Sequence, residues 1–122
     1  MDSNASVESS EVAGLSGSSL ILRWQGVDVP VYADEEALFG IGVAKENELQ
    51  IRGQFASRFH ALLRWHRNGF DLVDRSTNGV FVQLEDTQVR FIHRSSLRLW
   101  GRGYISFGEP LNKDNCLSFR NA

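Results

Sequence analysis

The feature that most constrains the fold of this chain is an alternation of apolar and polar residues that starts near Leu20 and continues almost to the C-terminus. Turn-forming residues interrupt it roughly every eight to twelve positions. Because successive side chains of a β-strand point to opposite faces, a period of two predicts strands that each bury one face. Short strands joined by tight turns are typical of an all-β sandwich or barrel, so we expect an all-β domain.

The apolar runs predict short strands over residues 20–24, 27–32, 37–43, 48–51, 59–67, 70–74, 80–84, 88–93, 97–100, 104–108 and 115–120. Pro30 cannot donate a ladder hydrogen bond, so its strand should lie at a sheet edge. Asn68 and Gly69 predict a two-residue type I′ turn between two of these strands. Three tryptophans are expected to pack in the core or against a sheet face: Trp24, Trp65 and Trp100.

Arginine recurs at every fourth position between residues 90 and 102, a spacing that would also suit one face of a helix. β-Branched neighbours and the glycines at 101 and 103 disfavour a helix there. With Phe91 and Trp100 nearby, the segment is also a candidate for nucleic-acid binding. However, the chain carries 13 basic and 15 acidic residues, so a surface that follows a phosphate backbone is not expected. The arginines concerned are Arg90, Arg94, Arg98 and Arg102.

Residues 1–19 contain seven serines, three acidic residues and little that could fill a core. This composition predicts a disordered tail or linker, followed by one domain over residues 20–120. The single cysteine, Cys116, excludes an internal disulfide and is expected to be a buried thiol. Neither a signal peptide nor an apolar stretch long enough to span a membrane is visible, so a cytoplasmic protein is expected.

Charge is spread unevenly, because residues 51–79 carry five basic and two acidic side chains whereas residues 1–50 carry two and nine. Within the positive segment, two polar clusters flank a predicted hairpin. Ser57, Arg58 and His60 come just before its first strand, and the run from Asp74 to Gly79 follows its second. Since the two strands pair antiparallel, both clusters should meet at one end of the sheet.

The second cluster contains more than a turn requires. Asn78 and Gly79 can be explained by the turn itself, but the hydroxyls of Ser76 and Thr77 cannot. A binding site is expected where hydrogen-bond donors gather in a loop at the end of a strand. Two hydroxyls and a guanidinium from two loops suit a small oxyanion, and phosphate is the best match in charge and number of acceptors.

The two clusters resemble the motifs of the forkhead-associated (FHA) domain, and the resemblance runs from about Leu20 to Phe119. The residues that carry it are Ser57-Arg58-x-His60, Asp74-x-Ser76-Thr77-Asn78-Gly79 and Gly42 before them. The run LRLWGRGYISFGEPL is also similar to FHA domains attached to some bacterial class III adenylate cyclases. The resemblance implies an FHA-like β-sandwich of about eleven strands whose loops at one end bind phosphothreonine peptides.

The resemblance also implies a role for each residue of the clusters. Ser57 and Thr77 would donate hydroxyl hydrogen bonds to the phosphate, and Arg58 would pair with its charge. Asn78 would bond the peptide main chain next to the phosphothreonine. The remaining residues would support the loops: Gly42, His60, Asp74, Ser76 and Gly79.

One position departs from the family, because the usual Gly-Arg pair before the first loop reads Gly42-Val43 here. A hydrogen bond to a charged group contributes about 1.5–3 kcal/mol, so the loss should weaken phosphopeptide binding roughly 10- to 150-fold. Lys45, Arg52 and Arg75 could supply a replacement cation. The alternative function is a degenerate FHA scaffold that binds proteins independently of phosphorylation or regulates an attached catalytic domain.

Two other kinds of site are not expected. Ser57 or Ser76 with His60 and Asp74 would make a catalytic triad, but no GxSxG nucleophile elbow is present. The three histidines and Cys116 lack the spacing of metal ligands. We therefore predict a phosphothreonine-peptide-binding signalling module without catalytic activity, whose partner is a phosphorylated protein rather than a nucleic acid, membrane, metal or cofactor.

Overall fold

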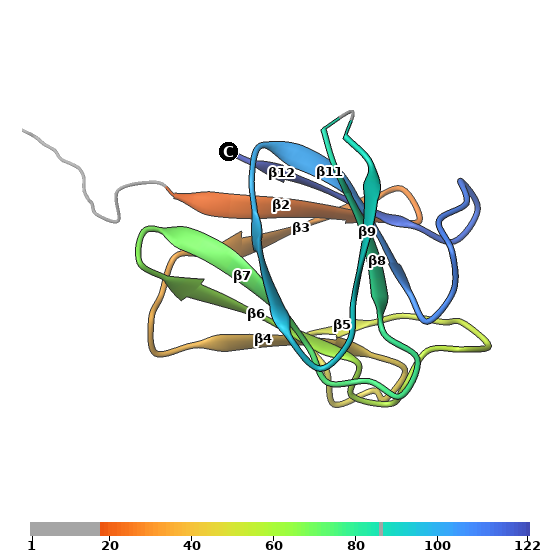
Figure 1. Ribbon diagram of the computed structural model, residues 1–122. Coiled ribbons are helices and arrows are strands. Elements are labelled where there is room, and N and C mark those ends of the chain that lie inside the picture. The colour runs from red at the N-terminus through yellow and green to blue at the C-terminus, as the bar shows by residue number, and fades with distance from the viewer. Residues whose placement is uncertain (1–17, 86) are drawn as a thin grey trace, which may run out of the picture.

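Eleven strands and no helix make up the described part of the chain, residues 18–85 and 87–122 of a computed structural model (Figure 1). The strands form two sheets that pack face to face. The smaller sheet has the strand order β10-β7-β6-β4-β5, and the larger sheet has the order β3-β2-β12-β11-β8-β9. Neighbouring strands are antiparallel except β4 and β5, which are parallel. The all-β sandwich predicted from the alternation is confirmed.

The five-stranded sheet contains β4 (Leu38–Gly42), β5 (Leu49–Gln50), β6 (Ala61–His66), β7 (Gly69–Asp74) and β10 (Ser96–Leu99). The six-stranded sheet contains β2 (Ser19–Trp24), β3 (Val27–Tyr32), β8 (Val80–Leu84), β9 (Val89–Ile92), β11 (Arg102–Phe107) and β12 (Leu117–Asn121). Each predicted run ends within two residues of an observed strand end. The position of the strands could therefore be read from the alternation alone.

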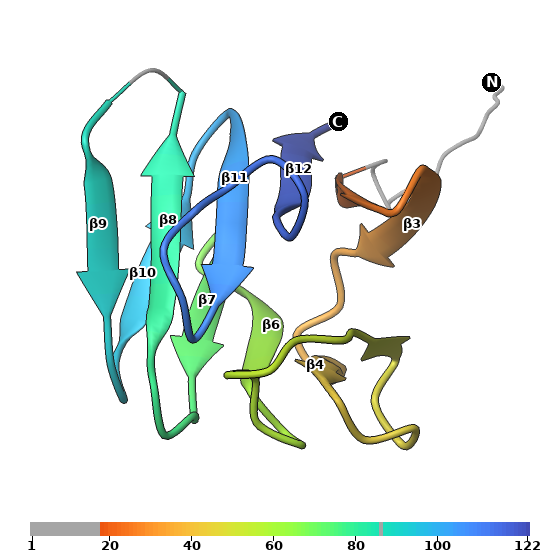
Figure 2. The same ribbon diagram turned by 90° about the vertical axis from the view of Figure 1, so that its right-hand side faces the viewer.

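The apolar positions of the alternation face the space between the sheets. On β2, Leu20 and Leu22 are fully buried whereas Arg23 is exposed, and on β8 Val80 and Val82 are fully buried. In Figure 2, β10 and β7 lie behind β8 and β11, so each sheet covers the inner face of the other. The inward side chains form one contiguous core, and each buried Leu or Val contributes about 1.5–3 kcal/mol.

Several single-residue expectations can be compared with the structure. Pro30 lies on β3, which is the outermost strand of its sheet, so the predicted edge position is confirmed. Trp24 and Trp65 pack against the core, but the prediction for Trp100 is wrong, because its side chain follows the end of β10 and is 63% exposed. Cys116 is half-buried rather than buried. The arginines at 90, 94, 98 and 102 are distributed over three strands and a loop.

The turn between β6 and β7 is displaced by one residue from the prediction. Its central residues are Arg67 and Asn68, whose φ angles are 51° and 60°, as a type I′ turn requires. This register places Trp65 opposite Phe70, and their ring centroids lie 4.9 Å apart in an edge-to-face contact. Local residue preference favours a turn at Asn68 and Gly69. The observed turn lies one residue earlier, in the register that brings Trp65 and Phe70 together.

Gly69 begins β7, and its lack of a side chain makes room for Arg98 of β10. A Cβ on Gly69 would lie 2.2 Å from Nη1 of Arg98. The Arg98 guanidinium donates to the Asp71 carboxylate (2.7 Å) and to the carbonyl of His66 (2.8 Å). The glycine thus allows an arginine to tie the edge strand β10 to the hairpin.

Four loops lie together at one end of the sandwich, residues 43–48, 51–60, 75–79 and 93–95 (Figure 1). At the opposite end, the N–H of Ala122 donates to the carbonyl of Ser19 (3.0 Å). Most of the tail predicted at 1–19 lies outside the described residues. No helix in residues 18–85 and 87–122 is long and apolar enough to cross a membrane.

Replacing Arg67 with Asn should stabilise the domain by about 0.5–1 kcal/mol, because Asn tolerates a positive φ better than Arg does. Urea unfolding followed by tryptophan fluorescence measures the change. Arg52→Asn is the matched control, since Arg52 is exposed and has no positive φ, and it should change stability by less than about 0.5 kcal/mol. A loss of stability in Arg67→Asn would indicate a turn centred on Asn68 and Gly69.

Candidate phosphate-binding site

Ser57 is the residue at which the loops of one end meet. Its carbonyl accepts the N–H of Val43 (3.0 Å), and its Oγ accepts the N–H of Thr77 (3.3 Å). Its own N–H donates to Nδ1 of His60 (2.9 Å). Because Oγ acts as an acceptor in the bond to Thr77, the hydroxyl proton of Ser57 stays available to donate to a ligand.

Gly42, the last residue of β4, lies against the backbone of the 57–60 segment. A Cβ at this position would lie 2.1 Å from the carbonyl oxygen of Arg58 and 2.9 Å from the backbone nitrogen of His60. On either side, the N–H of Ala44 donates to the Arg58 carbonyl (3.0 Å) and the N–H of His60 donates to the Ile41 carbonyl (2.9 Å). Only glycine permits two backbones to approach this closely.

The imidazole of His60 is fully buried between the 51–60 and 75–79 loops. Since Nδ1 accepts the N–H of Ser57, Nε2 carries the proton and donates it to the carbonyl of Gly79 (2.8 Å). The ring packs edge-on against Phe107. Burial lowers the pKa of His60 below its ordinary 6.5, although the Gly79 carbonyl and the Asp74 carboxylate, 3.7 Å away, act in the opposite direction. The neutral ring is therefore the form that joins the loops.

Asp74, the last residue of β7, organises the 75–79 loop. Its Oδ1 accepts the hydroxyl of Ser76 (2.7 Å), and the Oγ of Ser76 in turn accepts the N–H of Gly79 (2.7 Å). Its Oδ2 accepts the N–H of Arg94 (2.8 Å), whose Nε donates to the Ser76 carbonyl (2.7 Å). Ser76 is buried and its hydroxyl lies within the turn's own hydrogen bonds, so the expectation that the turn does not explain this hydroxyl is wrong.

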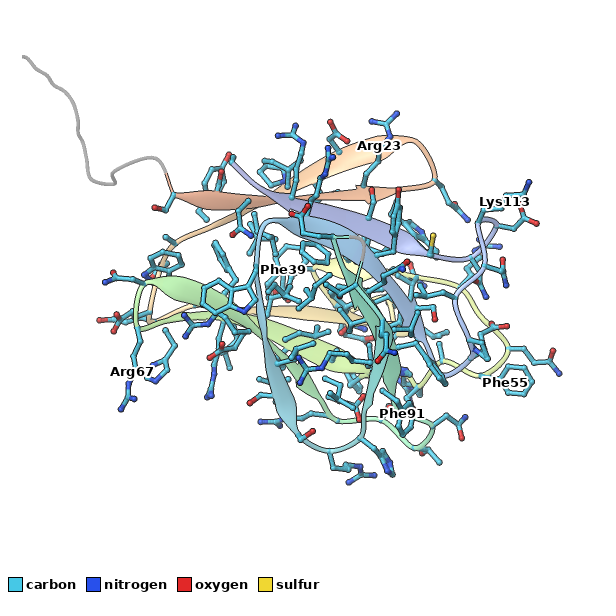
Figure 3. All side chains as sticks on the ribbon, turned by 45° about the horizontal axis from the view of Figure 1, so that its top comes forward. Arg23, Phe39, Phe55, Arg67, Phe91 and Lys113 are labelled. Carbon is cyan, nitrogen blue, oxygen red and sulfur yellow. The ribbon has the colours of Figure 1, made fainter. Side chains whose placement is uncertain are left out.

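Three polar side chains of the two motifs remain exposed at this end. The guanidinium of Arg58 lies over the ring of the next residue, 5.7 Å from its centroid. Thr77 is exposed beside its bond to Ser57. Asn78 donates through Nδ2 to the carbonyl of Phe55 (3.1 Å), a residue that Figure 3 shows at the outer tip of the loop region. These groups offer guanidinium, hydroxyl and amide donors to an anion.

The three candidate substitute cations are all exposed and lie in different places. β4 ends at Gly42, so Lys45 lies in the loop of residues 43–48 rather than on a strand that runs beside Ser57. Arg52 follows β5 in the long loop. Arg75 borders a separate hollow of about 380 Å³ on the outer face of the five-stranded sheet. Among the described residues, no hydrogen bond directs any of these three side chains towards Ser57.

Sequence reasoning missed two residues that hold the loops. Asn47 donates through Nδ2 to the carbonyls of Ala44 (2.7 Å) and Arg58 (2.8 Å), which fixes the 43–48 loop against the 51–60 loop. Arg94 belongs to the four-residue arginine spacing but anchors Asp74 and Ser76. No local motif marks Asn47. Arg94 could have been found only by knowing that the turn between β9 and β10 lies beside the end of β7.

The geometry does not form a catalytic triad. A triad needs a serine hydroxyl hydrogen-bonded to the imidazole. His60 instead bonds to a backbone N–H and a backbone carbonyl, and Ser76 donates its hydroxyl directly to Asp74. In the part of the chain that the structure describes, no three His, Cys, Asp or Glu side chains gather as metal ligands.

Comparison with known families agrees with these two motifs. The model of the FHA domain matches residues 39–108, more than half of the chain and both of the loops described above. The chain belongs to the FHA domain family. No curated protein matches it.

Solved FHA structures share this fold. The FHA-1 domain of Mycobacterium tuberculosis Rv1747 has a TM-score of 0.69 at 20% identity, over 86% of this chain and 97% of that one. Mycobacterium tuberculosis EmbR in complex with a low-affinity phosphopeptide has a TM-score of 0.60 at 25% identity, over 84% of this chain and 24% of its own. The N-terminal FHA domain of S. cerevisiae Rad53p in complex with a phosphothreonine peptide has a TM-score of 0.62 at 17% identity, over 85% and 90%. The FHA-like sandwich is confirmed, and the roles of individual residues stay predictions.

The unfolding free energy of this FHA domain should fall as the pH is lowered from about 7.5 to about 5.5. Burial depresses the pKa of His60 in the folded state, so below about 6.5 the unfolded chain binds a proton that the folded chain does not. One such proton lowers stability by up to about 1.4 kcal/mol per pH unit, until the folded pKa is reached. Urea unfolding at a series of pH values measures this decline.

His60→Gln should remove most of that decline. It should also lower the stability at about pH 7.5, because the N–H of Ser57 and the carbonyl of Gly79 lose their partner. His66→Gln is the matched control, since His66 is exposed, and should leave the decline in place. An unchanged decline in His60→Gln would assign the pH dependence to another group.

Gly42→Ala should destabilise the domain by about 1–3 kcal/mol, because the added methyl group must displace the backbone of Arg58. Gly53→Ala is the control, because a Cβ there would lie 3.5 Å from the Cβ of Ala56, an ordinary contact. Urea unfolding of both variants measures the difference. Equal stabilities would contradict the close approach of the two backbones.

Proposed function

We propose that this FHA domain binds a phosphothreonine peptide of a partner protein, as a signalling module, through the loops 51–60 and 75–79. Ser57 carries the proposal, because it accepts a hydrogen bond from Thr77 in the second loop and keeps its own proton free to donate. A phosphate at this point would receive donors from both loops. The Rad53p structure, which was solved with a phosphothreonine peptide, supports the same ligand class.

Each exposed donor has a part in this proposal. Ser57 and Thr77 donate hydroxyl hydrogen bonds to the phosphate, and Arg58 pairs with its charge, in bonds that a charged partner strengthens. Asn78 exchanges its bond with the Phe55 carbonyl for one with the peptide main chain. The buried residues keep the loops in register: Gly42, His60, Asp74, Ser76 and Gly79.

Val43 sets the expected affinity. It stands at the position of the usual arginine, so one charged donor is absent and binding should be weak. The same observation favours a second candidate function, a phosphorylation-independent scaffold. Lys45, Arg52 and Arg75 remain proposed substitutes, each of which would need to turn towards Ser57 when the ligand binds.

The domain would have no catalysis of its own and would act in the cytoplasm, where a kinase phosphorylates its partner. Residues 20–120 would form the binding module, and residues 1–19 would be a tail or linker. The similarity of residues 97–111 to FHA domains of bacterial class III adenylate cyclases supports attachment to such an enzyme.

Fluorescence-polarisation titration with a degenerate phosphothreonine peptide pool tests the proposal, beside phosphoserine and unphosphorylated pools. Saturable binding to the phosphothreonine pool alone is the expected result. Ser57→Ala and Arg58→Ala should abolish it while leaving the folded spectrum unchanged, and Arg90→Ala, exposed on β9, is the control for lost charge. Val43→Arg should tighten binding about 10- to 150-fold. If no pool binds at millimolar peptide, the scaffold function takes its place.

A further inference from the structure

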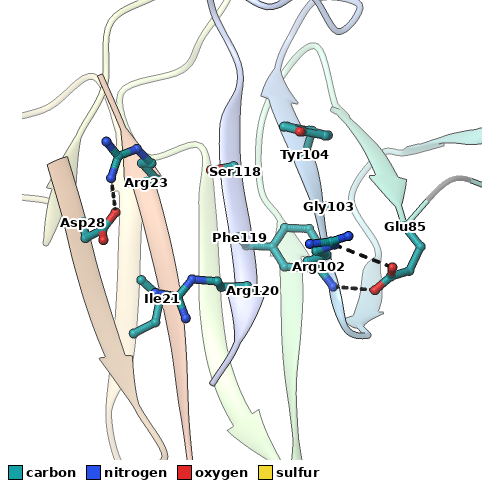
Figure 4. Close-up of a pocket in the computed structure, with 10 residues that line it drawn as sticks. All are labelled: Ile21, Arg23, Asp28, Glu85, Arg102, Gly103, Tyr104, Ser118, Phe119 and Arg120. Atoms are coloured by element: carbon teal, nitrogen blue, oxygen red, sulfur yellow. Dashed lines mark hydrogen bonds and ion pairs between the residues drawn. The ribbon is translucent and has the colours of Figure 1, made fainter. Parts of the chain in front are cut away.

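The outer face of the six-stranded sheet carries a hollow of about 550 Å³ that contains none of the residues of the candidate phosphate site (Figure 4). Three arginines from three adjacent strands surround it, Arg23 of β2, Arg120 of β12 and Arg102 of β11. Ser118 and the half-buried Ile21 line it between them. Asp28 and Glu85 also line it at its edges, so the hollow carries three basic and two acidic side chains.

Arg102 and Arg120 are directly opposite each other in the pairing of β11 with β12. Like charges at opposed positions destabilise a β-sheet, so this pair works against the fold. In Figure 4 the two side chains diverge, with the guanidinium of Arg102 turned towards Glu85 and that of Arg120 lying over Ile21. An anion between the two guanidinium groups would remove the repulsion.

The carboxylates near these arginines hold them only weakly. Arg23 donates to Asp28 at 2.8 Å, and Arg102 Nε lies 3.9 Å from Glu85, but all four side chains are at least half exposed. Exposed ion pairs contribute about 0–1 kcal/mol, so a ligand carboxylate can replace them. Among the described residues, no carboxylate lies within 4.0 Å of Arg120.

Neutral donors complete the hollow. Tyr104, 48% exposed, and Arg23 are the partners of Ser118 in the two neighbouring strand pairings, so the three side chains form a row across the sheet. The hydroxyls of Tyr104 and Ser118 can donate to a carboxylate oxygen that the arginines attract. Because β2, β12 and β11 are interior strands, their backbone N–H and C=O groups are paired within the sheet. A ligand in the hollow would therefore be recognised by side chains.

We propose that this hollow binds a short acidic segment of a partner protein, whose carboxylates pair with Arg23, Arg102 and Arg120. The arrangement favours a short anionic segment over a nucleic acid. Figure 4 shows Asp28 at one side of the hollow and Glu85 at the other, so a continuous polyanion that crossed the sheet would meet a negative charge at each end. A segment of a few acidic residues fits between them.

The test uses the whole chain and a fluorescein-labelled peptide with three consecutive glutamates flanked by glycine and serine, followed by fluorescence anisotropy at low and at physiological salt. Saturable binding that weakens with salt is expected. The double variant Arg102→Ala/Arg120→Ala should weaken binding about tenfold or more, whereas Arg90→Ala/Lys113→Ala, which removes the same charge elsewhere, should not. Ser57→Ala/Arg58→Ala should also bind normally, which separates this hollow from the candidate phosphate site.

Two further measurements keep the test decisive if the double variant is unstable. Amide shifts of the wild-type chain on addition of the peptide should map to Tyr104 and Ser118 rather than to Thr77. Arg120→Gln should weaken binding yet raise the melting temperature by about 1–4 °C, because one of the two opposed positive charges is removed. The proposal is overturned by no saturable binding at low salt, by equal loss in the charge-matched control, by shifts confined to the loops, or by tighter binding of an oligonucleotide of equal charge.

Discussion

The buried imidazole of His60 accepts a hydrogen bond from the loop of Ser57 and donates one to the carbonyl of Gly79. Loss of the ring would remove both bonds, whereas protonation would remove only the acceptor of the Ser57 N–H and leave Nε2 donating to Gly79. Each lost bond costs about 1–3 kcal/mol. The ring thus holds the loop of Ser57 beside the loop of Thr77, where these two residues are hydrogen-bonded. Buried groups thus set the geometry, while exposed ones are left to meet a ligand.

The alternation of apolar and polar residues predicted the strands because burial on one face is a local constraint that each strand satisfies separately. Features that depend on neighbouring strands were harder to predict. The turn at Arg67 and Asn68 is one residue from its expected place, and there Trp65 meets Phe70 in the core. Trp100 is exposed although its strand was correctly placed, because β10 ends before it.

The candidate site also combines residues that the local sequence predicted with residues whose positions depend on other parts of the fold. The motif residues at Ser57, His60 and Thr77 were found because they lie in short runs beside a predictable hairpin. The acceptor of the Ser76 hydroxyl is also close in sequence, but its burial depends on how the loop packs. Asn47 and Arg94 act from loops whose approach to the motif follows from the arrangement of both sheets, and nothing in their own segments marks them.

The two proposed binding surfaces differ in how they are built. The loops rely on a hydrogen-bonded framework to aim their donors, whereas the arginine hollow uses side chains standing on a rigid sheet. A partner that carried both a phosphothreonine and an acidic stretch would engage them as linked sites. The second contact would then form at a high effective concentration, and the pair would offset the weak phosphate affinity that Val43 implies.

The hydrogen bond between Ala122 and Ser19 has a consequence for how the domain can be combined with others. The chain enters and leaves the sandwich at one point, at the end away from the four loops (Figure 1). Such a unit can be inserted into a surface loop of a host protein without stretching the host or covering the loops. For the same reason its two ends can be joined by a short linker and the chain reopened elsewhere, which makes the domain a natural candidate for circular permutation.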